Sequence, residues 1–534
     1  MYRTLLEEVV PTYYENREKL KEMALESIKS TYNEFSGKTM LENITKSFIE
    51  VKSKEESMSD KKSDLSNFDN NKTQNLRPPD WVSDAVFYQI FPERFYNGNP
   101  ENDPEDTEAW GGKPTRKNFF GGDLQGVIQK LDYLKELGIN AIYLNPIFKS
   151  PTNHKYDTTD YYEIDPAFGN KSILKSLVNT AHEKNMKVIL DGVFNHCGEN
   201  FSKFQDVKKK GNDSNYWDWY EVDGFPVETE PEPNYRCWAG VPYMPEFDRT
   251  NPEVRRYLLD IVQYWIEEAD IDGWRLDTTN YLEPGFVRSV RTAAKEVKPE
   301  AYVMGEVVGP ASSWFKSGSL DGVMNYELYK YLVDFLANED YGAREFRHRI
   351  YFLRRSYPEW ANFGNYNLLG SHDRPRFMTL CEKDPDRFEL SYFFLFTFPG
   401  APAIYYGDEV GMEGGDDPDC RRTYPWNENI YHGELLDYFK KLVKLRKEVE
   451  ALREGGFREI AANDQVFAYA RGNSKGQVLG VINSGSRQNQ IEVSSRELSP
   501  VYSGEVLFGD AILNKKKGGL QLKIPGYGYC LLKL

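Results

Sequence analysis

The sequence predicts an α/β fold: a (β/α)8 barrel with a small domain inserted after its third strand, a C-terminal antiparallel β-sandwich and a short helical N-terminal extension. Apolar, strand-like runs alternate with amphipathic stretches from Trp81 onward, which is the pattern of a parallel sheet. Several of these runs end on a carboxylate or a histidine, and a barrel gathers such residues at the carboxyl ends of its strands. The 534 residues also exceed the usual size of one hydrophobic core, so more than one domain is expected.

The N-terminal extension is expected over residues 1–79. Apolar residues at near-helical spacing, such as Leu5, Val9 and Leu20, predict short amphipathic helices. Over residues 51–79 the composition shifts to Lys, Ser, Asp, Asn and Glu, which cannot bury enough apolar surface to offset the entropy of ordering. We therefore expect a polar linker or long loop between the helices and the barrel.

The barrel is expected over residues 80–195 and 246–453. Short apolar runs predict its eight strands at residues 86–90, 141–144, 188–193, 273–276, 301–304, 322–325, 365–369 and 403–406. Residues 196–245 are too many for an ordinary loop between a strand and a helix, so they are expected to form the inserted domain. Apolar and polar residues then alternate between Gly and Asn turns, which predicts the β-sandwich over residues 454–534.

The net charge excludes two kinds of partner, and the cysteines and apolar runs indicate the compartment. The formal net charge is −16, whereas nucleic acids and anionic membranes bind concentrated basic surfaces. We therefore expect neither partner. The five cysteines are an odd number without a Cys-x-x-Cys pair, which indicates free thiols in a reducing compartment. The first residues contain no uninterrupted apolar core and no later run approaches the ~18 residues needed to span a bilayer, so a cytoplasmic protein is expected.

Four segments place a reactive residue just after a predicted strand. They are Val188-Ile-Leu-Asp-Gly-Val-Phe-Asn-His196, Asp272-Gly-Trp-Arg-Leu-Asp277, Tyr302-Val-Met-Gly-Glu-Val307 and Leu368-Leu-Gly-Ser-His-Asp373. A single Asp after an apolar run is more often a helix N-cap than a catalyst, and an isolated histidine is more often a core residue. The joint pattern instead favours one catalytic cleft, because the ends of parallel barrel strands meet on one face.

These four segments, in this order, resemble the signature regions of the α-amylase superfamily, glycoside hydrolase family 13. Met244-Pro-Glu-Phe-Asp248 resembles an additional motif of the neopullulanase, cyclomaltodextrinase and maltogenic amylase branch, and the stretch from Asn145 to Asp160 is also similar to that branch. The similarity covers roughly residues 80–534. It implies a retaining hydrolase that cleaves α-glucosidic bonds, mainly α-1,4, in cyclodextrins, maltooligosaccharides, pullulan or starch through a covalent glycosyl-enzyme intermediate.

The resemblance also implies residue roles. Two carboxyl groups must flank the scissile bond, and Asp277 matches the nucleophile while Glu306 matches the general acid and base. Asp373 matches the third carboxylate, which binds sugar hydroxyls. Asp191 is expected to support Arg275, whose side chain points to the same side of the strand as Asp277 and can keep it ionised. The residues expected to bind substrate are Tyr156, His154, His196, Arg275, His372 and Arg376.

A second cluster has the character of a cation site. Asn97-Gly-Asn-Pro-Glu-Asn-Asp103 and Gly121-Gly-Asp123 carry side-chain oxygens on glycine-bearing loops, which suit a hard divalent cation. In the related branch the matching loop binds calcium, which implies a structural calcium ion and no organic cofactor. The ligands would be Asn97, Asn99, Asn102, Asp103, Gly121 and Asp123. A solvated turn is the alternative.

Two segments depart from the pattern of the branch. Thr278-Thr-Asn-Tyr-Leu-Glu-Pro284 follows the nucleophile where Val-Ala-Asn-Glu-Val is common, and Val307-Val308 stands where Ile-Trp is common. Both lie where the leaving half of the substrate would sit, so the preferred α-glucan and linkage stay open. A transglycosylase on the same donors is the alternative function, and a non-catalytic binding or assembly protein is a third.

The leading segment also departs from the branch, whose members usually begin with a β-sandwich module that helps to form a dimer. Residues 1–79 are too short and too helical for such a module. Monomer and homo-oligomer therefore both remain open.

Overall fold

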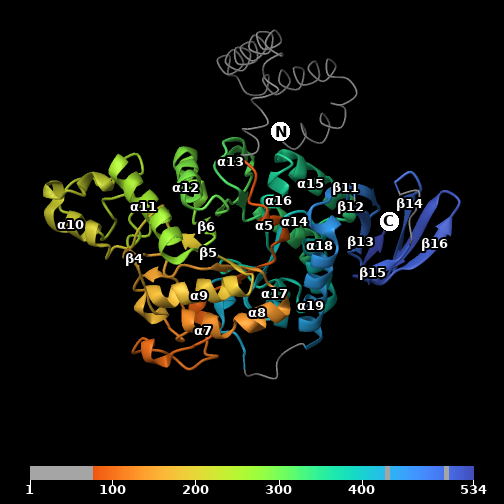
Figure 1. Ribbon diagram of the computed structural model, residues 1–534, viewed down its shortest axis with the longest axis horizontal. Coiled ribbons are helices and arrows are strands. Elements are labelled where there is room, and N and C mark those ends of the chain that lie inside the picture. The colour runs from red at the N-terminus through yellow and green to blue at the C-terminus, as the bar shows by residue number, and fades with distance from the viewer. Residues whose placement is uncertain (1–75, 427–432, 475, 498–503) are drawn as a thin grey trace, which may run out of the picture. The chain divides into compact units, whose positions relative to one another are not determined.

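The computed structural model describes residues 76–426, 433–474, 476–497 and 504–534 (Figure 1). Residues Leu76–Leu534 form one compact unit. The predicted helical extension falls outside the described residues, apart from its last four positions, and stays a prediction.

Within the described residues, eight parallel strands form the barrel sheet, in the order β8-β7-β6-β5-β2-β1-β10-β9. Their bounds are β1 (Phe87–Ile90), β2 (Ala141–Leu144), β5 (Lys187–Gly192), β6 (Gly273–Leu276), β7 (Tyr302–Gly305), β8 (Gly322–Val323), β9 (Tyr366–Asn367) and β10 (Ala401–Tyr405). Each lies within a few residues of a predicted strand. The predicted (β/α)8 barrel is therefore confirmed.

The strands are buried on both faces, as parallel strands covered by helices must be. Side chains alternate between two surroundings: Ile189 packs inside the barrel with Tyr143 and Tyr302, whereas Val188 and Leu190 pack in the larger cluster that includes helix residues. The same alternation turns polar residues inward near the strand ends. Asp191 on β5 is paired in register with Arg275 on β6.

The strands are followed by helices that cover the barrel (Figure 1). Those outside the inserted segment are α5 (Trp81–Asp84), α6 (Pro92–Phe95), α7 (Leu124–Gln129), α8 (Leu131–Leu137), α9 (Lys171–Glu183), α11 (Pro252–Ala269), α12 (Pro284–Val297), α13 (Ser312–Lys316), α14 (Tyr326–Leu332), α15 (Ala343–Ser356), α16 (Ala361–Gly364), α17 (Phe377–Leu380), α18 (Pro385–Thr397), α19 (Gly433–Glu448) and α20 (Glu450–Arg453). Local sequence sets several of their starts. Asn170, Asn251 and Asp384 each accept hydrogen bonds from the first turn of the following helix, and the last two precede a proline.

The barrel closes between its two shortest strands, β8 and β9. A parallel bridge joins Met324 to Tyr366. Side-chain amides supply further hydrogen bonds there: Asn365 Oδ1 accepts from the backbone of Val323 at 3.2 Å, and Asn325 Nδ2 donates to Asn367 Oδ1 at 2.9 Å. We call these three asparagines the asparagine seam.

Two irregular segments stand over the carboxyl ends of the strands. The loop after β2 carries a small hairpin, β3 (Phe148–Lys149) and β4 (Asp160–Ile164). The long segment between β5 and α11 contains α10 (Ser202–Lys210) and several 3-10 turns. An antiparallel bridge between His196 and Glu246 joins the two ends of this long segment. In the core of the segment, the ring of Phe204 packs on the rings of Tyr220 and Tyr235.

Antiparallel sheets form the C-terminal domain, as predicted (Figure 1). In the described part of the chain, one sheet has the order β11-β12-β13-β18-β15 and a second has the order β14-β17-β16. The bounds are β11 (Gly456–Ala462), β12 (Val466–Asn473), β13 (Gly476–Asn483), β14 (Asn489–Ser494), β15 (Val506–Gly509), β16 (Ile512–Lys516), β17 (Gly519–Ile524) and β18 (Tyr529–Lys533). Alternate residues, such as Val481, Ile491 and Leu522, form the core between the sheets.

Candidate active site

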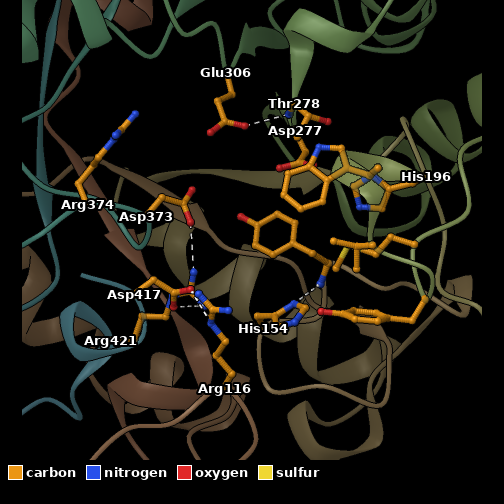
Figure 2. Close-up of a pocket in the computed structure, with 15 residues that line it drawn as sticks. Arg116, His154, His196, Asp277, Thr278, Glu306, Asp373, Arg374, Asp417 and Arg421 are labelled. Carbon is orange, nitrogen blue, oxygen red and sulfur yellow. Dashed lines mark hydrogen bonds and ion pairs between the residues drawn. The ribbon is translucent and has the colours of Figure 1, made fainter. Parts of the chain in front are cut away.

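The predicted carboxylates line one cavity of about 450 Å³ (Figure 2). Asp277, Glu306 and Asp373 follow three different strands, and their carboxylates point into this space. The lining residues are Arg116, His154, Tyr156, His196, Trp238, Val241, Tyr243, Met244, Asp277, Thr278, Glu306, Asp373, Arg374, Asp417 and Arg421. The fold thus brings together residues that are far apart in sequence, from Arg116 to Arg421.

A single buried guanidinium organises the carboxylates. Arg275 is fully buried, and its Nη1 donates to Asp191 Oδ1 and to Asp277 Oδ1, each at 2.8 Å. Its Nη2 forms an ion pair with Glu306 Oε2 at 2.9 Å. Because both terminal nitrogens of one planar group are engaged, the carboxyl groups of Asp277 and Glu306 are held as neighbours. Asp191 lies behind Arg275, where the sequence places its supporting carboxylate.

Burial and charge act in opposite directions on Asp277. Removal from water raises the pKa of the Asp277 carboxyl well above its usual value, the nearby charges of Glu306 and Asp191 raise it further, and Arg275 opposes them. Loss of Arg275 would therefore leave Asp277 more readily protonated. The guanidinium is the group that favours the ionised, nucleophilic form.

The two oxygens of Glu306 have different surroundings. Oε2 accepts a hydrogen bond from the backbone N–H of Thr278 at 2.9 Å (Figure 2). The same oxygen forms the ion pair with Arg275. A proton on Oε2 would oppose both contacts. The other oxygen, Oε1, is therefore the atom suited to carry a proton into the cavity.

His372 supports the site from behind and does not line the cavity. Its Nδ1 lies 2.9 Å from Gln89 Nε2, an amide donor, and its Nε2 lies 2.6 Å from the hydroxyl of Tyr156 and 3.0 Å from Asp373 Oδ2. Burial lowers the pKa of His372 well below its usual value, so the ring is neutral and carries its proton on Nε2. The structure thus places this predicted substrate-binding residue where it orients Tyr156 and Asp373.

Two other predicted histidines do face the cavity. His196 Nε2 is buried and has no hydrogen-bond partner among the described residues, and the ring lies 5.6 Å from that of Trp238. His154 Nδ1 accepts from the backbone N–H of Tyr156 at 3.1 Å, which leaves its Nε2 as the donor. Burial lowers the pKa of each of these two histidines to about 3, so both are neutral donors near neutral pH.

Arg376 does not line the cavity, which corrects the prediction that it contacts substrate. Its side chain is fully buried, donating to the carbonyl of Cys420 at 3.0 Å and to Asp408 Oδ1 at 2.9 Å. The cationic group beside Asp373 is instead Arg421, whose Nη2 donates to Asp373 Oδ1 at 3.1 Å. Arg376 therefore holds the backbone of the segment that presents Arg421. Sequence reasoning could not separate these arginines, because neither lies in a strand with a fixed alternation.

Several lining residues were missed from the sequence. Trp238 and Tyr243 come from the inserted domain, whose length predicts a wall but not which aromatic faces the cavity. Arg421 and Asp417 lie in a charged run after β10, and their place just past a barrel strand was the available signal. Arg374 has no carboxylate within ion-pair distance among the described residues, and its guanidinium lies over the ring of Tyr326.

The loop predicted to hold calcium presents oxygen atoms around a glycine. Asn97 Oδ1 and Asn102 Oδ1 are buried without hydrogen-bond partners among the described residues. Gly121 has φ +82°, and a Cβ at this position would lie 2.4 Å from Asp103 Oδ1. Asp123 is already engaged, because its carboxylate accepts from the backbone of residues 98, 99 and 126 and from Asn102 Nδ2. Unpaired amide oxygens beside a carboxylate are a donor set that fits a hard cation.

Across residues 76–534, gaps aside, no group of three or more His, Cys, Asp or Glu side chains is arranged to hold a metal ion. In the same described ranges, no helix combines the length and apolar character needed to cross a bilayer.

Comparison with known proteins agrees with this geometry. A family model described as the catalytic domain of alpha amylase matches residues 89–434. A cyclomaltodextrinase from Geobacillus thermopakistaniensis (strain MAS1) is 47% identical over 463 residues, which cover 85% of this chain and 78% of that protein. Neopullulanase 2 from Thermoactinomyces vulgaris is 42% identical over 459 residues, covering 84% of this chain and 77% of that protein.

A solved structure matches the fold over a similar span. The cyclic alpha-maltosyl-(1→6)-maltose hydrolase from Arthrobacter globiformis, in complex with cyclic alpha-maltosyl-(1→6)-maltose, has a TM-score of 0.80 and 37% sequence identity. The match covers 86% of this chain and 100% of that chain.

Proposed function

Because the chain belongs to the alpha-amylase family, in the branch of the cyclomaltodextrinases and neopullulanases, we propose that Asp277 and Glu306 perform its hydrolysis of α-glucosidic bonds. The observation that carries these roles is the shared contact of both carboxylates with Arg275. A retaining pair works at a separation of about 5 to 5.5 Å, without room for a water molecule between carboxylate and sugar. Two carboxylates on one guanidinium suit that arrangement.

The reaction takes two steps. In the first, Glu306 Oε1 gives its proton to the glycosidic oxygen while Asp277 attacks the anomeric carbon, so that the bond to the leaving sugar breaks and a glycosyl ester forms. In the second, Glu306 removes a proton from water, which attacks the same carbon and releases Asp277. Two inversions retain the α configuration.

The remaining cavity groups bind the sugar at the cleavage point. Asp373, held by Arg421, accepts hydrogen bonds from sugar hydroxyls, while the neutral rings of His154 and His196 donate. The ring of Tyr156 offers an apolar face, kept in place by stacking on His372 at 5.4 Å.

Cyclic and short linear α-glucans are the substrates best suited to this cavity. The inserted domain narrows it with Trp238 and Tyr243, and its volume lies in the range of small-molecule sites. The names of the similar proteins, cyclomaltodextrinase and cyclic alpha-maltosyl-(1→6)-maltose hydrolase, support the same class.

We also propose that the loop at Asn97–Asp103 holds calcium through Asn97, Asn99, Asn102, Asp103, the carbonyl of Gly121 and Asp123. The ion would stabilise the start of the barrel and would contribute no reacting group. A reducing compartment, the cytoplasm, is proposed from the five cysteines, which are all free thiols.

The roles of the two carboxylates are tested by comparing Asp277→Asn with Glu306→Gln. Asp277→Asn should lose nearly all turnover on every substrate, because the ester cannot form. Glu306→Gln should lose much more activity on maltotriose than on 2,4-dinitrophenyl α-maltoside, whose leaving group needs no proton. Asp386→Asn, at an exposed carboxylate of α18, serves as the control.

Proton NMR of the first product formed gives an independent test, since retention yields the α anomer. Equal losses on both substrates for both variants, or a β product, would contradict the assignment.

A further inference from the structure

The residue after the proposed nucleophile has an unusual backbone conformation. Thr278 has φ 44° and ψ 42°, in the left-handed region. Among the residues with positive φ in the described part of the chain, Thr278 is the only one that is β-branched. A β-branched residue is rarely found there, and such outliers persist where the surrounding structure enforces them.

This conformation turns the chain toward Glu306. The N–H of Thr278 donates to Glu306 Oε2 at 2.9 Å, and the N–H of the next residue, Thr279, donates to the carbonyl of Glu306 at 3.1 Å. The hydroxyl of Thr279 donates a hydrogen bond to the carbonyl of Leu276 at 2.8 Å. The loop after β6 is thereby bound both to its own strand and to Glu306, the residue that follows β7.

Asn280 extends the same connection by one residue. Its Oδ1 accepts from the N–H of Val308 at 2.7 Å, and its Nδ2 donates to the carbonyl of Val308 at 3.3 Å. A carboxamide that satisfies both backbone groups of one residue fixes the path of that segment. We call the contacts of Thr278, Thr279 and Asn280 with Glu306 and Val308 the loop clamp.

The far side of the clamp is anchored by a buried arginine. Arg249 donates through Nη2 to the carbonyl of Tyr281 at 2.9 Å and through Nη1 to the carbonyl of Asn195 at 2.9 Å. It is 3% exposed and also pairs with Glu283. The clamp is therefore held rigidly enough to determine where Glu306 lies.

We propose that Thr278 and Asn280 are positioning residues for Glu306: they fix the carboxyl group, with Oε2 engaged and Oε1 free, at the place where the leaving sugar needs its proton. This inference rests on the proposed role of Glu306 as acid and base. It adds that the loop after the nucleophile, which has Thr278 where Val is common in the branch and keeps the Asn of the branch at Asn280, controls proton transfer. The left-handed backbone conformation of Thr278 directs its N–H toward Glu306 Oε2.

Asn280→Ala is the direct test, because Asn280 is exposed and its loss leaves the core intact. A small displacement of a catalytic group can lower a rate by about 100-fold. We expect kcat on maltotriose to fall about 10- to 100-fold with little change in KM, and kcat/KM on 2,4-dinitrophenyl α-maltoside to fall less than about threefold. Azide, a nucleophile that needs no base, should restore turnover on the activated substrate. Asn514→Ala is the control, because it removes an exposed asparagine of β16, outside the catalytic barrel, and should leave both rates unchanged.

The double variant Asn280→Ala/Glu306→Gln decides whether the clamp acts through Glu306. If it does, the double variant is no slower on maltotriose than Glu306→Gln alone, because the positioned group is already gone. Additive losses, equal losses of Asn280→Ala on both substrates, or an unchanged rate would overturn the proposal. A failure of the role of Glu306 itself would show separately, as a Glu306→Gln variant that does not distinguish the two substrates.

Discussion

Replacing Arg275 with methionine removes the charge that three carboxylates share while keeping most of the side-chain volume. The side chains of Asp191, Asp277 and Glu306 are 0%, 7% and 13% exposed, so water cannot replace the lost cation. Breaking a buried ion pair by removing one partner costs about 3 to 5 kcal/mol. A unit that spans Leu76–Leu534 has an unfolding entropy of about 1 kcal/mol/K, so Tm should fall by about 3 to 5 °C at pH 7.

The loss of stability should depend on pH in a defined direction. Burial already raises the pKa values of Asp191 and Asp277, and removal of Arg275 raises them further. A carboxyl group whose pKa is higher in the folded state takes up its proton before the unfolded chain does as pH falls. The deficit of the variant relative to the wild type is therefore complete above the raised folded-state pKa of the variant. It shrinks as pH falls through that pKa toward the lower folded-state pKa of the wild type.

Calorimetry of the wild type and Arg275→Met from pH 4.5 to 8 measures both quantities. Arg344→Met is the matched control, because Arg344 pairs with Asp464 at 3.0 Å on the surface, with side chains 67% and 89% exposed. Exposed pairs contribute little, so its Tm should change by less than about 1 °C. A Tm deficit for Arg275→Met that is absent, or that is equally large at pH 4.5 and pH 8, would refute the reasoning.

Two further predictions concern calcium and histidine. A chelator should lower the Tm of the wild type, because an ion bound only by the folded state stabilises that state by mass action. The chelator should have no effect on the Tm of Asp103→Asn. An unchanged wild-type melting curve would identify the loop as a solvated turn. NMR titration should show His196 neutral down to about pH 4, since its pKa is lowered to about 3, and His196→Gln should raise KM without moving the pH profile. Protonation of His196 near pH 6.5 would contradict the second prediction.

The barrel strands could be predicted because a parallel strand buried on both faces is a short apolar run bounded by loops. The same logic placed Asp277 and Glu306 correctly in one cavity, since each follows such a run directly. It could not tell that Arg376 and His372 do not line the cavity, because both lie in or beside an irregular loop where no fixed period indicates which side chain points inward. The positive φ of Thr278 had no sequence signal, because it is imposed by contacts with a distant loop.

The asparagine seam also limits which sequences can occupy this fold. Most neighbouring strands of the barrel pair in register through backbone N–H and C=O groups, which nearly every residue type carries, so many of those positions can vary among apolar side chains. At the closure, part of the pairing depends on the side chains of Asn325, Asn365 and Asn367. A library of single substitutions, scored only for folded yield, should therefore find these three positions nearly invariant although they lie outside the catalytic cavity. Such positions would look functional in any map of mutational tolerance, yet their constraint comes from closing a cylinder.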